Sequence, residues 1–158
     1  MNREMRRKDR EVLDRAEIDD ILRSSIYGHL GLCDEGEPYV VPLIFGVVDG
    51  VMYFHCAHEG RKMDVVRKNP RACFQVDADV RLIPADSSCG FGVGYRSVMA
   101  GGVISVVESE DEKIRALAAM MSKCAGEDFK PEFPSRNLAA ITVLRLDPDW
   151  ISAKARYS

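Results

Sequence analysis

The stretch from Tyr39 to Phe74 constrains the fold of this chain more than any other part of the sequence. Within it, Asp49-Gly50 separates the apolar runs VPLIFGVV and VMYF. This dipeptide is the usual signal for a two-residue hairpin, because a type I′ turn needs positive φ angles at both central residues. The stretch therefore predicts two antiparallel strands, a helix that begins after Gly60, and a third strand after Asn69-Pro70, where the proline ends the helix.

The first turn of this predicted helix carries an unusual charge. Arg61 and Lys62 lie there, although the helix macrodipole makes that end positive and disfavours each cation by up to ~1 kcal/mol. A bound anion such as a phosphate would remove the conflict, since it accepts hydrogen bonds from backbone N–H groups, an arginine and a lysine together. A solvated basic turn, partly offset by Glu59, is the other interpretation, and the local pattern leaves both open.

The remaining segments predict short strands and two further helices. Apolar residues recur at helical spacing from about Asp9 to Ser25 and from Ser109 to Lys123. Strands are expected over 27–33, 39–48, 51–56, 71–76, 80–83, 95–107, 140–146 and 150–153. Pro42 places its strand at a sheet edge or a bulge, because it lacks a backbone donor, and Gly101-Gly102 predicts a bulge.

The order of these elements predicts the fold class. Consecutive strands are mostly close enough for antiparallel hairpins, whereas a doubly wound sheet would alternate strands with helices. We therefore expect a mainly β (α+β) protein, an antiparallel β-barrel with about three flanking helices. No linker divides the chain, so residues 1–158 are expected to form a single domain, with residues 1–10 as an extended arm.

Composition narrows the functional classes. A net charge of −3 with 30% charged residues gives no general attraction to nucleic acid or to an anionic membrane. No apolar run approaches the ~20 residues that span a bilayer, and no secretory signal follows the basic N-terminus. The five cysteines are scattered without a CxxC pair, which favours a reduced, cytoplasmic protein.

Two rival chemistries are disfavoured. His55, Cys56 and His58 cluster, but neighbouring side chains on a strand point to opposite faces, so at most two converge and no zinc site is expected. For the same reason His55 and Cys56 do not form a nucleophile pair. The run from Gly90 to Gly94 lacks the GxGxxG spacing of a dinucleotide loop.

Five motifs in order resemble the 5-nitroimidazole-resistance-type proteins, which belong to the flavin-binding split-barrel superfamily that includes pyridoxamine 5′-phosphate oxidase. These motifs are MRRKDRE (Met5–Glu11), PYVVPLIFG (Pro38–Gly46), YFHCAHEGRK (Tyr53–Lys62), NPRACF (Asn69–Phe74) and YRSV (Tyr95–Val98). Their ordered succession is more specific than any one of them.

The resemblance implies a homodimer of split β-barrels with FMN in a cleft at the subunit interface. It implies a candidate catalytic residue, His55. The cofactor-binding candidates that it implies are Val41, Pro42, Leu43, Ile44, Phe45, His55, Cys56, Ala57, Arg61, Lys62, Gln75, Tyr95, Arg96, Ser97 and Val98. The first five would line the ring with backbone groups, and His55 to Ala57 with Arg61 and Lys62 would hold the phosphate. His55 would face either the phosphate or the substrate near flavin N5.

Three positions depart from the family pattern. Ile44 stands where members often have Asn, Cys56 where they often have Ser, and Cys89-Gly90-Phe91-Gly92 where they have an aromatic-rich loop. FAD, haem and the deazaflavin F420 are the alternative cofactors, since related split barrels bind them. The expected function is an FMN-dependent oxidoreductase, a nitroreductase or an oxidase of the pyridoxamine-phosphate type, that reduces small electrophiles. The alternative is a non-catalytic flavin- or haem-binding protein that senses or stores.

Overall fold

The computed structural model describes residues 4–126 and 128–157. In chain order its elements are η1 (Lys8–Arg10), β1 (Glu11–Val12), α1 (Arg15–Ser24), β2 (Tyr27–Asp34), β3 (Glu37–Val48), β4 (Val51–Cys56), α2 (Arg61–Lys68), β5 (Arg71–Ile83), β6 (Gly92–Val106), α3 (Glu110–Ala125), α4 (Ser135–Ala139) and β7 (Thr142–Arg156). None of the helices in the described ranges is long and apolar enough to cross a membrane.

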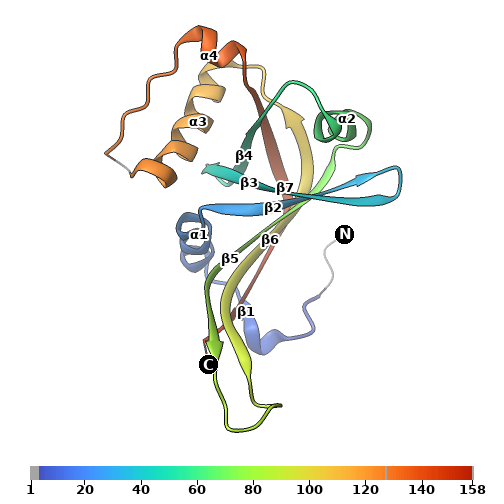
Figure 1. Cartoon of the computed structure of the whole chain (residues 1–158), viewed down its shortest axis with the longest axis vertical. Coiled ribbons are helices and arrows are strands. Elements are labelled where there is room, and N and C mark those ends of the chain that lie inside the picture. The colour runs from blue at the N-terminus through green and yellow to red at the C-terminus, as the bar shows by residue number, and fades with distance from the viewer. Residues whose placement is uncertain (1–3, 127, 158) are drawn as a thin grey trace.

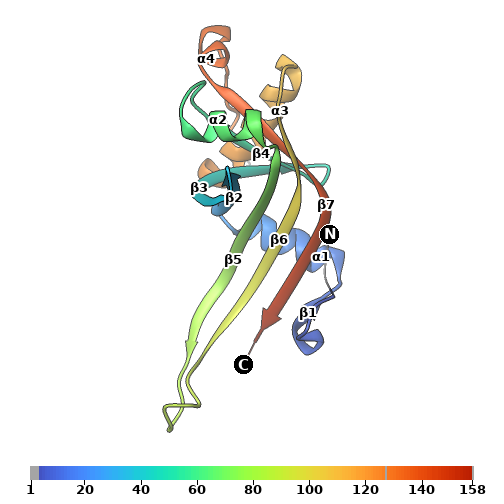
Figure 2. The ribbon, with the colours of Figure 1, turned by 90° about the vertical axis from the view of Figure 1, so that its right-hand side faces the viewer.

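The strands form one antiparallel sheet that closes on itself. Its order is β1-β7-β4-β3-β2-β5-β6, and a further pairing of β6 with β7 closes the barrel. Strands β5, β6 and β7 run on below the barrel as a long twisted ribbon, while α2, α3 and α4 lie around its upper end (Figures 1 and 2). The predicted α+β fold with an antiparallel split barrel and flanking helices is confirmed.

The barrel interior is filled by aromatic and aliphatic side chains. Phe74 packs edge-on against Phe45 and Phe54, with ring centroids 4.8 and 4.9 Å apart, and all three are buried. A second cluster lies outside the barrel wall, where α3 packs on β3 and β4. Gly46 permits this contact, because a Cβ there would lie 3.0 Å from the Ala119 Cβ atom.

The opening hairpin and the helix after it form as predicted. Asp49 and Gly50 have φ angles of 52° and 82°, as a type I′ turn requires. Helix α2 begins after Gly60 and ends before Asn69. On α3, the Ser109 hydroxyl accepts a hydrogen bond from the Glu112 N–H at 3.4 Å, which confirms the predicted N-cap.

The first helix and the N-terminal arm differ from the prediction. Helix α1 begins at Arg15 rather than near Asp9, because the Asp14 carboxylate caps it by accepting from the Ala16 N–H at 3.1 Å. The two residues of β1 before it pair with β7. The arm contains the short helix η1 in place of a fully extended chain, and residues 1–3 lie outside the described residues.

Two predicted strand breaks are also absent. The segments 71–76 and 80–83 are one strand, β5, because Asp79 absorbs the irregularity at a φ angle of 53°. Strand β7 continues through Asp147-Pro148, because it accommodates one extra residue, Asp149, opposite the Gly101-Gly102 step of β6. The bulge expected at these glycines therefore lies on β7 and not on β6. The loop predicted from Ala125 to Asn137 overlaps the short helix α4.

Candidate functional site

The barrel is split where β3 leaves β4. Only residues 45–48 of β3 pair with β4, so the first part of the strand, residues 37–44, pairs with β2 alone. The two-residue turn pairs Val48 with Val51 through backbone hydrogen bonds, and hydrogen-bonding direction alternates along a strand. The N–H and C=O groups of Val40 and Ile44 and the C=O group of Pro42 therefore face the open edge. Pro42 has no N–H to leave unpaired there, as expected for an edge position.

Side chains alternate along this open edge. Val41 and Leu43 pack against the barrel core, whereas Val40, Pro42 and Ile44 are exposed on the outer face. Phe45 is fully buried where the pairing with β4 begins. Of the five predicted positions on β3, Pro42 and Ile44 form an apolar surface on the outer face. The side chains of Val41, Leu43 and Phe45 face the core.

The start of α2 lies beside this edge. The Arg61 Nε atom donates a hydrogen bond to Asp34 at 2.9 Å, and the guanidinium carbon lies 4.5 Å from the centroid of the Tyr39 ring. The Asp34 carboxylate therefore neutralises part of the positive charge that the sequence places at the start of this helix. No acceptor among the described residues contacts the other two nitrogen atoms of Arg61, so they remain available to an anion.

Backbone donors add to this positive end. Helix α2 has no side-chain N-cap, and Gly60 at a φ angle of 108° turns the chain into it. The Met63 and Asp64 N–H groups bond to the Gly60 carbonyl group at 2.8 and 3.2 Å. Within the described part of the chain, the Arg61 and Lys62 N–H groups have no acceptor, and the Lys62 ammonium has no ion-pair partner. These groups together form a site that fits a phosphate.

The end of β4 places its polar side chains on two faces. His55 is exposed and Cys56 points inward, with its Sγ atom 3.6 Å from the Met63 Sδ atom. Burial raises the pKa of the Cys56 thiol, and the Lys62 charge partly opposes this effect. His58 contacts the Thr142 hydroxyl at 2.6 Å and the Ala139 carbonyl group at 2.8 Å. Among residues 4–126 and 128–157, no three metal-ligating side chains gather.

The remaining candidates lie away from the open edge in the same chain. Gln75 on β5 lies opposite His29, and Ser97 on β6 lies opposite Asp77. Tyr95 is half-buried and Val98 is buried. Strand β6 pairs with β5 and β7 and not with β3. The structure therefore gathers Val41–Phe45, His55–Ala57, Arg61 and Lys62 around the split, and it separates Gln75 and Tyr95–Val98 from them.

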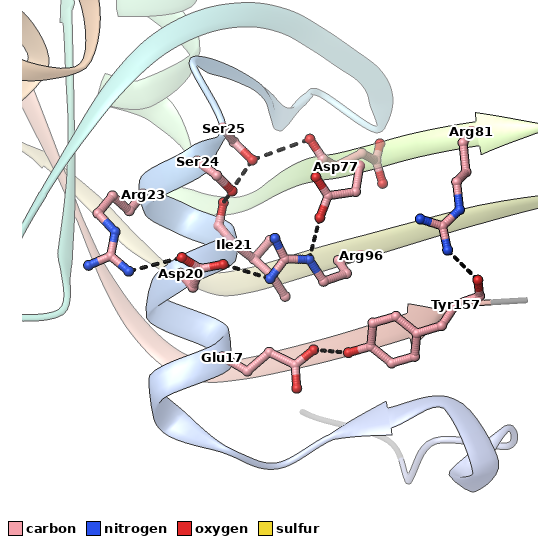
Figure 3. Close-up of polar contacts among 11 residues, drawn as sticks. Glu17, Asp20, Ile21, Arg23, Ser24, Ser25, Asp77, Arg81, Arg96 and Tyr157 are labelled. Atoms are coloured by element: carbon pink, nitrogen blue, oxygen red, sulfur yellow. Dashed lines mark hydrogen bonds and ion pairs between the residues drawn. The ribbon is translucent and has the colours of Figure 1, made fainter. Parts of the chain in front are cut away.

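Arg96 is held in a polar network at the surface of α1 (Figure 3). Its guanidinium donates to Asp20 at 2.7 Å and to Asp79 at 2.6 Å. These two ion pairs raise the pKa of Arg96, and they attach α1 to the β5–β6 ribbon. Arg96 therefore has a structural role in this chain.

Sequence reasoning missed Asp34 and Tyr39 as partners of Arg61. Both lie on the β2–β3 hairpin, more than 20 residues before the helix that they contact. In the sequence, these two residues are visible only as an acid and an aromatic residue on either side of Gly36. No pattern near them in the sequence indicates that they contact Arg61.

A family profile described as pyridoxamine 5′-phosphate oxidase matches residues 14–155. None of the curated proteins searched matches the sequence significantly. Among solved structures, a protein from Bacteroides thetaiotaomicron, provisionally assigned to 5-nitroimidazole antibiotic resistance, is similar with 24% identity and a TM-score of 0.80 over 91% of this chain and 85% of that one.

Two further structures are similar in fold. The flavocytochrome Anf3 from Azotobacter vinelandii has 23% identity and a TM-score of 0.82, over 98% of this chain and 73% of that one. The FAD and heme binding protein from Mycobacterium smegmatis has 23% identity and a TM-score of 0.82, over 94% and 74% of the two chains. At these identities the likeness establishes the fold, and the profile, which spans most of the chain, establishes the family. The chain therefore belongs to the pyridoxamine 5′-phosphate oxidase family.

Proposed function

We propose that this protein binds a flavin, FMN, along the open edge of β3 and uses it to reduce small electrophiles such as nitro compounds. The observation that carries the proposal is the positive start of α2 beside that edge. Two nitrogen atoms of Arg61, the ammonium of Lys62 and two backbone N–H groups lack partners among the described residues there. Such a set suits the phosphate of FMN, because charge-assisted bonds from arginine and lysine are the strong ones.

The backbone groups along the open edge of β3 suit the ring of the flavin. The pyrimidine part of a flavin presents hydrogen-bond donors and acceptors along one side, and the backbone groups of Val40 and Ile44 offer both kinds. Pro42 and Ile44 give an apolar outer surface next to them. When bound, the flavin would supply the redox chemistry, while the protein orients it and tunes its ring nitrogens through hydrogen bonds. His55, exposed at the end of β4, is the proposed catalytic residue.

A second copy of the chain is proposed to cover the site. The outer face of the sheet leaves Val40, Met99 and Val103 exposed at 60%, 44% and 41%, and apolar surface of this kind favours association. Gln75, Tyr95 and Ser97 lie away from their own open edge, so in a homodimer they would contact the partner's flavin, whereas Arg96 is engaged in ion pairs and Val98 is buried. Sedimentation of the flavin-loaded protein as a stable particle of 17.6 kDa would contradict the dimer.

The proposed compartment is the cytoplasm. All five cysteines are free thiols, which suits a reducing environment.

A second candidate function is binding of a flavin or haem without turnover. The site favours it in one respect: Asp34 is already engaged with Arg61, and among the described residues no carboxylate contacts His55 to form a proton relay. The relatives named above include a flavocytochrome and an FAD and heme binding protein. A visible spectrum of the purified protein separates flavin from haem. Anaerobic reduction by NADH or NADPH, followed by addition of a nitroimidazole, separates an enzyme from a binding protein.

The phosphate site is tested by FMN titration of the flavin-free protein. Arg61→Ala with Lys62→Ala should weaken FMN binding by several kcal/mol, at about 1.5–3 kcal/mol for each charge-assisted bond. Arg67→Ala with Lys68→Ala is the matched control, because it removes two cations from the last turn of the same helix. Riboflavin, which lacks the phosphate, should bind both double variants about equally. Unchanged FMN affinity in the first double variant would place the phosphate elsewhere.

A further inference from the structure

The turn between β4 and α2, residues 57–60, leads into the proposed phosphate site. The ladder between β4 and β7 ends at the pair Cys56–Thr142, and α2 begins at Arg61. All four residues of the turn are exposed, so little packing holds the turn in place. Its conformation decides where α2 begins and therefore the direction in which the Arg61 and Lys62 N–H groups point.

One side chain of this turn, His58, reaches back to the rest of the fold. Its Nε2 atom lies 2.8 Å from the carbonyl oxygen of Ala139, the last residue of α4. Its Nδ1 atom lies 2.6 Å from the hydroxyl oxygen of Thr142, the first residue of β7. Helices α2 and α4 lie at the same end of the barrel (Figures 1 and 2). The ring therefore links the turn to α4 and β7 beyond the point where strand pairing ends.

The two contacts pair groups that would otherwise lack a partner. A carbonyl oxygen only accepts, so Nε2 carries a proton and donates to Ala139, and in the neutral ring Nδ1 accepts from the Thr142 hydroxyl. Thr142 is only 5% exposed, and its hydroxyl makes no other hydrogen bond among the described residues. The Ala139 carbonyl group lies at a helix end, where backbone acceptors have no partner within the helix. Leaving such groups unpaired is costly, so the ring is held at both nitrogen atoms.

The turn has one further attachment, which is weaker. The Arg67 guanidinium donates to the His58 carbonyl group at 3.3 Å on the exposed side of α2. This distance lies beyond the range of about 2.7–3.2 Å that is usual for N–H···O hydrogen bonds. The imidazole ring is therefore the main attachment of the turn.

We propose that His58 is a positioning residue for the phosphate site: by tying the turn to α4 and β7, its ring fixes the direction in which the start of α2 presents its donors. A site that is ordered before its ligand arrives loses less conformational entropy on binding. Hydrogen bonds behind a site keep the groups that contact the ligand in place. The role rests on the function proposed above, because it requires that a phosphate binds at the start of α2.

The role is tested by titrating flavin-free variants with FMN and with riboflavin, which lacks the phosphate. His58→Ala should weaken FMN binding about threefold to tenfold, the size expected for the loss of modest hydrogen bonds, and leave riboflavin affinity unchanged. His58→Gln, whose amide can still donate to Ala139, should weaken FMN binding by about twofold or less. Asn137→Ala, which removes an exposed uncharged side chain from α4, is the matched control and should bind both flavins as the unsubstituted protein does.

A double-variant cycle shows whether Thr142 acts through the ring. Thr142→Val should weaken FMN binding about twofold. It should add nothing further in combination with His58→Ala, because the ring that the hydroxyl orients is then absent. Equal losses of FMN and riboflavin affinity, additive losses in the double variant, or unchanged FMN affinity in His58→Ala would overturn the proposal.

Two comparisons separate this role from the proposed function. If Arg61→Ala with Lys62→Ala weakens FMN binding while His58→Ala does not, the flavin site stands and the positioning role fails. If FMN does not bind at all, inorganic phosphate is the probe, and it should raise the urea midpoint of the unsubstituted protein more than that of His58→Ala. That result would keep the positioned anion site while the flavin function fails, whereas equal shifts or no shift would remove both.

Discussion

Replacing Lys123 with methionine should remove a rise in stability that the unsubstituted protein shows as pH increases from about 8 to 10. Lys123 lies near the end of α3 and donates hydrogen bonds to the backbone carbonyl groups of Leu22 and Ser25, the latter at 2.8 Å. Its ammonium lies 3.5 Å from the centroid of the Phe45 ring. Burial in this position lowers the pKa of Lys123 from 10.5 to about 8.

The sign and size of the effect follow from proton linkage. Between these two pKa values the unfolded chain binds more protons than the folded chain, so the free energy of unfolding rises with pH. The difference between the two pKa values corresponds to at most ~3.4 kcal/mol, at about 1.4 kcal/mol per pKa unit. Because Lys123 is only half-buried, solvent screening reduces the expected contribution to ~1–2 kcal/mol.

The assay is urea unfolding of the flavin-free protein at pH 7 and pH 10, followed by the fluorescence of the single tryptophan, Trp150. Cysteine and tyrosine ionisation also changes stability in this range, so the quantity of interest is the difference between variant and unsubstituted protein. Lys113→Met is the control, because it lies ten residues earlier on α3, ~15 Å along the helix. Parallel pH dependence in the protein and in Lys123→Met would refute the reasoning.

Three further substitutions test the packing and polar contacts. Gly101→Ala should lower the free energy of unfolding by about 1–3 kcal/mol in urea, because the new Cβ would lie 2.4 Å from the Trp150 ring. Asp14→Ala should cost about 1 kcal/mol in the same assay, since it removes the N-cap of α1. Arg96 lowers the pKa of Asp20, which contributes stability above the usual aspartate pKa and loses it as pH falls through the lowered value. Arg96→Gln should therefore be less stable at neutral pH, with a flatter loss of stability in acid, measured by circular dichroism.

Elements with short-range signals were predictable from the sequence. Asp49-Gly50 determines its own turn type, and Ser109 caps a helix whose first acids follow at once. Asn69-Pro70 ends α2 for the same local reason. In each case the residues that decide the conformation lie within a few positions of each other, so a single sequence contains the physical cause.

Elements decided by distant contacts were not predictable. The pairing of β1 with β7 brings Glu11 opposite Lys154, more than 140 residues later. Strand β7 passes through Asp147-Pro148 because Gly102 has no side chain: a Cβ there would lie 1.8 Å from the Asp147 carbonyl oxygen. The proline read alone predicts a break, and only the glycine on the neighbouring strand explains why none forms.

The candidate site depends both on short-range sequence signals and on contacts between residues far apart in the sequence. The cations at the start of α2 are visible in the sequence, but their surroundings are not, since Asp34 and Tyr39 reach Arg61 from another hairpin. Asp34 engages Nε alone, and this geometry orients the guanidinium without occupying its two outer nitrogen atoms. A carboxylate in this position therefore acts in two opposing ways: it orients the arginine for an incoming phosphate, and it repels that phosphate. Anion affinity at this helix start depends on the balance between these two effects, and Tyr39, which adds no charge while it holds the same guanidinium, shifts that balance toward binding.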